Sequence, residues 1–164
     1  MSSVIVTMQI ALFKSRSKIG KVIRYYTRSP YSHCAMVFDD GSIIEAREFK
    51  GVRRVKSLLE DMDEGQEVDL FDFEATPEQQ AIIKDFLEKQ IGKDYDYWMV
   101  VVGFVLKTTR ENRKHSGKWF CSELLFAACE KANFLLLKNI EPWKVAPAMI
   151  SWSPLLTFNS KVTK

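Results

Sequence analysis

Residues 31–46, YSHCAMVFDDGSIIEA, constrain the fold of this chain more than any other stretch. Two apolar runs flank an Asp-Asp-Gly sequence, which is typical of a β-hairpin. His33 and Glu45 lie inside those runs, where a valine or isoleucine would pack better. A half-buried carboxylate without a partner is costly, so we expect Glu45 to have one. The stretch therefore predicts an antiparallel hairpin with two polar side chains that its packing does not explain.

The segments around the hairpin have strand patterns first and helix patterns later. Strands are expected at 4–13, 49–55 and 67–75, with an acidic loop or short helix at 56–65. A basic amphipathic helix is expected at 14–28, an apolar helix at 95–107 and a further helix at 119–134. This order favours an α+β fold with an antiparallel sheet packed against helices. At 164 residues the chain suits one domain, residues 1–164.

The clearest helix pattern follows residue 75. Thr76 can cap this helix, Pro77 fits its first turn and Gln79 completes a capping box. Gly92 is expected to end it. Its buried stripe is predicted to consist of Ile82, Ile83, Phe86, Leu87 and Ile91.

Charge and cysteine usage narrow the possible partners and compartment. The net charge of +3 is too small to indicate a nucleic-acid partner. The basic segment 14–28 is typical of a solvated helix face, and peripheral contact with an anionic membrane or cell-wall surface is the alternative. Three cysteines without a CxxC pair predict reduced thiols and no metal site. Without an expected signal peptide or membrane span, we expect a cytoplasmic protein. Phage origin, or delivery to the cell envelope by another route, is an alternative.

The three cysteines have different expected surroundings. Cys121 begins a predicted helix, where the macrodipole and free backbone N–H groups favour the thiolate and can receive an oxyanion. Cys129 lies deep in that helix and is expected in the core, as is Cys34, which alternates with His33 along a strand. A nucleophilic cysteine needs a base, and the base needs an orienting acceptor. Cys121, His33 and Glu45 are best explained together as such a set.

Four motifs of the sequence together resemble those of a known family. SHCAMVFDDGSIIEA, GVRRVKSL, GKDYD and KWFCSELLFAACEKA occur in the order found in the circularly permuted NlpC-type papain-like cysteine hydrolases. The resemblance is to their YiiX-like group, which is related more distantly to the lecithin retinol acyltransferase-like enzymes. It covers about residues 10–155 and implies a papain-like fold with the nucleophile at a helix N-terminus.

The resemblance also implies roles and chemistry. Cys121 corresponds to the nucleophile, His33 to the general base and acid, and Glu45 to the orienting residue. Tyr95 corresponds to a family tyrosine that positions substrate or oxyanion, or it simply packs at a helix junction. Glu123 is expected to favour the helix N-terminus electrostatically, and His115 to be solvated in a loop. The implied activity is an amidase, peptidase or esterase with an acyl-cysteine intermediate and no cofactor. Its substrate is expected to be a cell-wall peptide amide or a lipid-type acyl group.

Two alternatives to a hydrolase remain open, as does the oligomeric state. An acyltransferase would use the same residues with an alcohol or amine as acceptor. A non-catalytic module would bind lipid or peptide without needing a nucleophile.

The hairpin register separates two candidates for the orienting residue. A two-residue loop at Asp40-Gly41 would pair His33 with Glu48 and point Glu45 away. A three-residue loop, residues 39–41, would pair Ala35 with Glu45 and place Glu45 on the face of His33. Because the resemblance selects Glu45, we predict the three-residue loop and keep Glu48 as the alternative.

Overall fold

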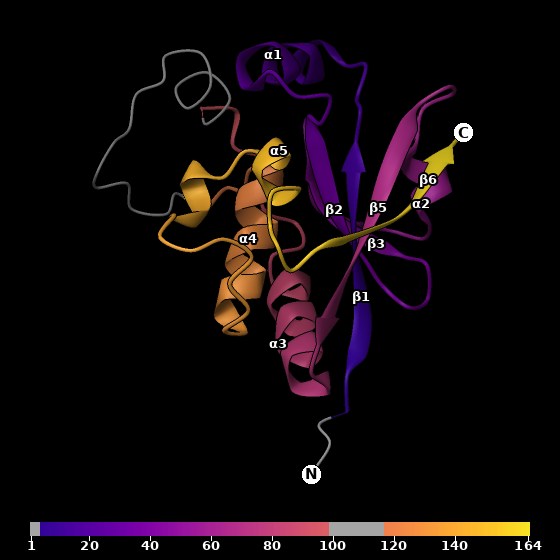
Figure 1. Ribbon diagram of the computed structural model, residues 1–164. Coiled ribbons are helices and arrows are strands. Elements are labelled where there is room, and N and C mark those ends of the chain that lie inside the picture. The colour runs from indigo at the N-terminus through magenta and orange to yellow at the C-terminus, as the bar shows by residue number, and fades with distance from the viewer. Residues whose placement is uncertain (1–3, 99–116) are drawn as a thin grey trace.

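The computed structural model describes residues 4–98 and 117–164 (Figure 1). In these residues the main element is a six-stranded sheet of order β4-β3-β2-β1-β5-β6, in which all neighbouring strands are antiparallel. The strands are β1 (Val6–Phe13), β2 (His33–Val37), β3 (Ile43–Arg47), β4 (Gly51–Val55), β5 (Glu67–Ala75) and β6 (Thr157–Thr163). The helices are α1 (Lys18–Thr27), α2 (Leu58–Asp61), α3 (Pro77–Glu88), α4 (Cys121–Lys131), the 3₁₀ helix η2 (Pro142–Lys144) and α5 (Pro147–Ile150). The predicted α+β class with an antiparallel sheet is confirmed.

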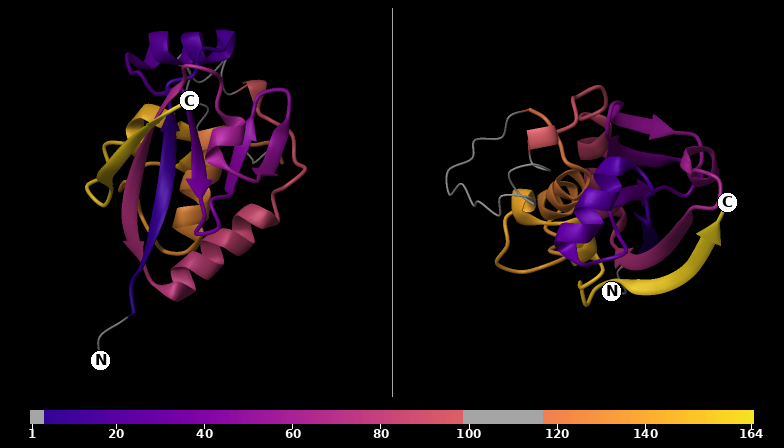
Figure 2. Two further views of the ribbon diagram at one scale, coloured as in Figure 1. Left: turned by 90° about the vertical axis from the view of Figure 1, so that its right-hand side faces the viewer. Right: turned by 90° about the horizontal axis from the view of Figure 1, so that it is seen from above.

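Helices cover the two faces of the sheet unequally (Figures 1 and 2). α3, α4 and α5 lie on one face, and α1 lies across one end of the sheet. The larger apolar core fills the space between α4 and the sheet, and its members include Ile10, Leu12, Met36, Ile44, Leu124 and Leu125. A smaller core lies on the other face under α2, with Phe13, Ala35, Ile43, Leu58 and Val68. Side chains that alternate along β1, β2 and β3 therefore enter two different cores.

The β2–β3 hairpin has the predicted three-residue loop. Met36 pairs with Ile44 and Val37 with Ile43, and the Phe38 N–H donates to the Ser42 carbonyl at 2.9 Å. Gly41 closes the loop with a φ of +77°, a conformation that glycine adopts without steric cost. Continuing this register past the paired residues places Glu45 on the face of His33. The two-residue register is therefore wrong.

The α3 helix begins as predicted and ends early. The Gln79 N–H donates to Thr76 Oγ1 at 3.2 Å, and the Thr76 N–H donates to Gln79 Oε1 at 3.0 Å, which is the predicted capping box. The helix stops at Glu88, and Gly92 lies in the turn that follows. Ile91 is 44% exposed, so its assignment to the buried stripe was wrong. The turn after Glu88 directs Ile91 outward, which helical periodicity does not anticipate.

Other boundaries differ from the predictions at the ends of elements. The helix expected at 14–28 begins at Lys18, because the Ser17 hydroxyl caps it by accepting the Gly20 N–H at 2.9 Å. The segment 56–65 contains the short helix α2. Strand β6 was not predicted, because TFNSKVT shows no apolar alternation and is largely exposed. Most of the helix expected at 95–107, and His115, lie outside the described residues. In the described part of the chain, no helix has the length and apolar character to cross a membrane.

Gly51 links the sheet edge to the segment that carries Tyr95. Its φ is +69°, and a Cβ there would lie 2.5 Å from the Lys93 carbonyl oxygen. The Val52 N–H donates to that carbonyl, and the Gly92 N–H donates to the Val52 carbonyl, both at 2.8 Å. A side chain at position 51 would separate these backbones. This close approach sets the position of Tyr95, which bridges to Trp119, two residues before α4 begins.

Candidate active site

Three predicted site residues come from three elements: His33 and Glu45 lie on the α2 side of β2 and β3, and α4, which begins at Cys121, packs against the other side of these strands. His33 is the first residue of β2, Glu45 lies in the middle of β3, and Cys121 is the first residue of α4. Cys121 and Glu45 have no exposed surface, and His33 is 4% exposed. Polar groups with this little access to water must be satisfied by one another.

His33 and Glu45 form the central contact of the site. His33 Nε2 lies 2.5 Å from Glu45 Oε2. The ring of Phe13 packs against the imidazole at a centroid distance of 5.0 Å. Because Nε2 is engaged by the carboxylate, Nδ1 is the imidazole nitrogen that can face a thiol. Glu45, and not the alternative Glu48, is thus the hydrogen-bond partner of His33.

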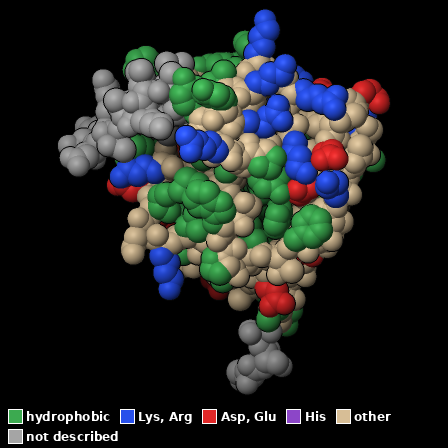
Figure 3. Space-filling model, turned by 45° about the horizontal axis from the view of Figure 1, so that its top comes forward, with side chains coloured by type: hydrophobic (Ala, Val, Ile, Leu, Met, Phe, Trp, Pro, Cys, Tyr) green, Lys and Arg blue, Asp and Glu red, His purple; other side chains and the backbone are tan. Residues whose placement is uncertain are grey.

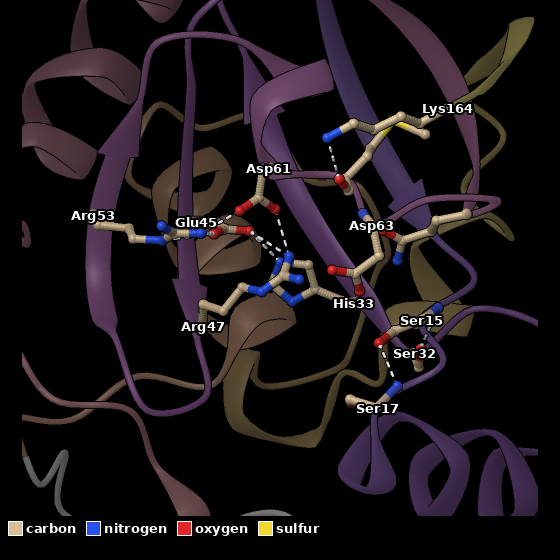
Figure 4. Close-up of polar contacts among 12 residues, drawn as sticks. Ser15, Ser17, Ser32, His33, Glu45, Arg47, Arg53, Asp61, Asp63 and Lys164 are labelled. Carbon is tan, nitrogen blue, oxygen red and sulfur yellow. Dashed lines mark hydrogen bonds and ion pairs between the residues drawn. The ribbon is translucent and has the colours of Figure 1, made fainter.

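Two arginines and an aspartate surround Glu45, and Arg47 approaches the same carboxylate oxygen that contacts His33 (Figure 4). Arg53 Nε and Nη2 donate to Glu45 Oε1 at 2.9 and 2.7 Å, and Arg47 Nη1 lies 3.6 Å from Oε2. Asp61, from α2, pairs with both guanidinium groups. We call Glu45, Arg47, Arg53 and Asp61 the charged cluster. It holds the carboxylate in one orientation, because both of its oxygens have fixed partners.

The pKa values of the Glu45–His33 pair follow from these contacts. Burial by itself would raise the pKa of Glu45, but the positive charges of His33, Arg47 and Arg53 lower it to about 2. Burial by itself would lower the pKa of His33, but the charge of Glu45 and the contact with Cys121 raise it to about 10. Charge pairing thus outweighs desolvation in both groups, and the pair is ionised at neutral pH.

The thiol of Cys121 completes the arrangement. Burial raises its pKa, but hydrogen bonds from Cys34 and His33 and the positive charge of His33 bring it down to about 6. Its position at the first turn of α4 adds the positive end of the helix dipole. These contacts favour a thiolate–imidazolium pair at neutral pH.

Sequence reasoning did not find the charged cluster. Arg53 and Arg54 are adjacent in GVRRV, and nothing in their composition distinguishes a buried arginine from a solvated one. In the structure Arg53 pairs across the ladder with Glu45, whereas Arg54 pairs with Asp40 and Glu88. Strand alternation combined with the register from β3 to β4 was the signal that could have separated them.

Cys34 has a closer relation to the site than predicted. It faces the α4 side of the sheet and belongs to the larger core, as expected from its alternation with His33. Its thiol and its backbone, however, both lie close enough to lower the pKa of the Cys121 sulfur. Burial and the neighbouring Cys121 raise the pKa of the Cys34 thiol itself. Cys34 therefore acts as a neutral donor beside the sulfur of Cys121.

Tyr95 is buried beside Cys121. Its ring packs on Phe120 at 5.8 Å, and burial, followed by the negative charge of Cys121, raises its pKa. Tyr95 also lines a surface pocket of about 380 Å³. The other residues of this pocket are Phe49, Lys50, Gly51, Asp94, Tyr97 and Lys118. Tyr95 thus connects the thiol environment with an open, partly aromatic surface.

The start of α4 has no side-chain cap from Phe120. Instead, Glu123 Oε2 accepts the Phe120 N–H at 3.4 Å, and the Ser122 hydroxyl donates to the Val145 carbonyl. The contact of Glu123 agrees with its expected place at the helix N-terminus. Both contacts fix the first turn on which Cys121 lies.

Comparison with known proteins identifies the architecture. No family model and no curated protein matches the chain. The crystal structure of metalloprotein YiiX (DUF1105) from Escherichia coli O157:H7 superimposes with a TM-score of 0.52 and 20% sequence identity, over 96% of this chain and 98% of that one. The chain has the YiiX fold. The predicted likeness to the YiiX-like group is supported at the level of the fold.

The name of that structure raises the question of a metal here. Among residues 4–98 and 117–164, no three His, Cys, Asp or Glu side chains are placed to hold a metal ion. The donors nearest the site are already engaged, since His33 Nε2 binds Glu45 and Glu45 binds Arg53. The described residues of this chain therefore do not fit a metal centre, although the chain shares the YiiX fold.

Proposed function

We propose that this protein is a cysteine hydrolase of the permuted NlpC-type, papain-like class that cleaves an amide or ester bond. The observation that carries the proposal is the contact series Cys121–His33–Glu45, buried at a helix N-terminus. A structural cysteine needs neither an ionised imidazole nor a carboxylate behind it.

The reaction begins with attack of the Cys121 thiolate on the substrate carbonyl carbon. A C–S bond forms, and the carbonyl electrons move onto oxygen. In this proposal, backbone N–H groups at the start of α4, where Cys121 is the first residue, receive the resulting oxyanion. The His33 imidazolium then gives its proton to the leaving amine or alcohol, which departs and leaves an acyl-cysteine.

The second half of the reaction returns the site to its starting state. Neutral His33 takes a proton from water, the hydroxide attacks the acyl carbon, and the C–S bond breaks. The products are a carboxylic acid and the thiolate, with the proton back on His33. Throughout, Glu45 stays ionised, because Arg47 and Arg53 hold its charge.

The pocket beside Tyr95 is the proposed binding place for part of the substrate. Phe49 and Tyr97 give it aromatic walls, and their rings lie 5.6 Å apart. Lys50 and Lys118 add positive charge at its border. These walls suit an acyl group or peptide with an apolar portion. Because Cys121 is fully buried, the site must open locally before the carbonyl reaches it.

The test is incubation of the purified protein with a panel of cell-wall peptides, lipid esters and lipid amides, with mass spectrometry of products and of Cys121. We expect an acyl adduct on Cys121 and release of the carboxylic acid. Cys121→Ala is the inactive control, and Cys129→Ala is the matched variant that keeps activity. Added glycerol or a primary amine separates hydrolysis from acyl transfer, since transfer would give the ester or amide as the main product. Absence of any adduct across the panel, together with an unreactive Cys121 thiol, would contradict the proposal.

A further inference from the structure

The helix α1 carries an unpaired basic surface. Six of the 24 basic residues of the chain lie in residues 14–28, which contain no acidic residue. Without these six, the 21 acidic residues outnumber the basic ones, so the positive net charge of the chain comes from this segment. Among the ion pairs of the described residues, Lys14 is the one member of the six that takes part, with Glu67 and Asp69.

The side chains of α1 divide between two faces. Gly20 and Ile23 are its buried residues and turn toward the sheet. Lys18, Lys21 and Tyr25 follow one another at intervals of three and four residues, which places them on the same outward stripe. Tyr25 is 78% exposed. We call Lys18, Lys21, Val22, Tyr25 and Arg28 the α1 surface.

The α1 surface combines positive charge with exposed apolar groups. Val22 is 37% exposed and lies beside Tyr25 on the outward side of the helix. Figure 3 shows Lys and Arg side chains gathered over this end of the molecule. Basic residues attract the negative charge of anionic lipids, and tyrosine side chains favour the boundary between headgroups and acyl chains. A soluble polyanion would use the charges and would gain little from Tyr25.

We infer that the α1 surface docks on an anionic lipid bilayer. This inference stands independently of the proposed hydrolase activity, although it places the candidate site beside the membrane. Five residues, 28–32, connect the end of α1 to β2, whose first residue is His33. At the start of α1, the Ser15 N–H donates to Ser32 Oγ at 3.1 Å, which ties the helix to the residue before His33 (Figure 4). A bilayer on α1 would therefore present esters or amides of its lipids at this end of the sheet.

The experiment is co-sedimentation of the full chain with vesicles of phosphatidylcholine alone or mixed with phosphatidylglycerol. We expect binding to the mixed vesicles only, weakening as salt is raised. Lys18→Glu with Lys21→Glu should weaken binding by more than about tenfold, and Tyr25→Ala by about threefold or more. The matched control is Lys84→Glu on α3 with Lys89→Glu at its C-cap, which changes the net charge equally at the other end of the molecule and should leave binding nearly unchanged.

Three results would overturn the inference. The first is no binding to the mixed vesicles at low salt. The second is an equal loss of vesicle binding in the α1 and α3 double variants. The third is binding to soluble heparin that is as strong as binding to the mixed vesicles and that Tyr25→Ala leaves unchanged. The last result would identify a general polyanion surface. Thermal unfolding and the alkylation rate of Cys121 are measured in every variant. Unchanged values show that the variants are folded, and they test the thiol separately from the lipid surface.

Discussion

Cys121 and Cys129 lie about two turns apart on the same helix, and neither has exposed surface. Burial is the sole cause acting on Cys129, and it raises the pKa of that thiol to about 12. Cys121 is desolvated as well, yet its pKa falls to about 6. The contacts with Cys34 and His33 make the difference. Burial alone therefore makes a cysteine inert, and polar partners supplied by other strands make it reactive.

The largest effect should come from removing each sulfur in turn. Cys121→Ala should reduce turnover of any substrate by about a thousandfold or more, because no nucleophile remains. Cys129→Ala should keep turnover near the native rate and lower the free energy of unfolding by about 1 kcal/mol through lost packing. Turnover assays with urea unfolding of both variants decide. Comparable losses of turnover in the two folded variants would contradict the proposed difference between Cys121 and Cys129.

His33→Ala should reduce turnover by about a hundredfold or more, since the general base and acid is lost. It should also slow alkylation of Cys121 at neutral pH, because the pKa of Cys121 rises when its cationic partner is removed. Alkylation of Cys129 should not change, which supplies an internal control. Native alkylation of Cys121 in folded His33→Ala would show that the imidazole does not act on this sulfur.

Glu45→Gln should reduce turnover by about tenfold or more, because the imidazolium of His33 loses its buried counter-charge. Glu48→Gln should have little effect, since Glu48 lies in the turn after β3 and does not bond to His33. Removing a buried charge also lowers stability, so Glu45→Asp is the second variant that retains the charge. Turnover is measured well below the unfolding midpoint of each variant. A larger loss in Glu48→Gln than in both Glu45 variants would transfer the orienting role to Glu48.

Arg53→Met and Arg54→Met form a pair of neighbouring substitutions with different expected results. Losing Arg53 removes a positive charge near the site and frees one carboxylate oxygen of Glu45. Turnover should then fall about threefold to tenfold, and the alkylation midpoint of Cys121 should move to higher pH. Arg54 pairs on the other side with Asp40 and Glu88, so its loss should move neither quantity. Arg53→Lys should move the alkylation midpoint of Cys121 part of the way back toward its native pH, because lysine restores the positive charge. Loss of packing alone would not explain this partial return.

Local signals in the sequence were sufficient for the hairpin and for the three central residues. His33 and Glu45 are polar residues in apolar runs, and Cys121 begins a helix pattern, so each is unusual in its own segment. The choice of a three-residue loop, which the resemblance suggested, was correct and put Glu45 on the face of His33.

The charged cluster and the second thiol depend on contacts between distant segments. Arg53 and Asp61 have ordinary surroundings in sequence, and only the β3–β4 register and the packing of α2 bring them to Glu45. Alternation gave the face of Cys34 but not its contact with Cys121, because α4 approaches β2 from a segment nearly ninety residues later. Strand β6 was missed because an exposed edge strand need not alternate.

The most direct test of the account is the pH dependence of alkylation at Cys121 and Cys129, followed residue by residue with a short iodoacetamide pulse. Both sulfurs are fully buried, so exposure in the resting protein does not separate them. The rate at Cys121 should rise with pH to a plateau, with its midpoint near the pKa of about 6, because the thiolate forms as pH passes that value. Cys129 should react at least about a hundredfold more slowly at neutral pH, since it stays protonated. Equal rates at the two sulfurs, or a midpoint at Cys121 near the ordinary thiol value of about 8.5, would contradict the account.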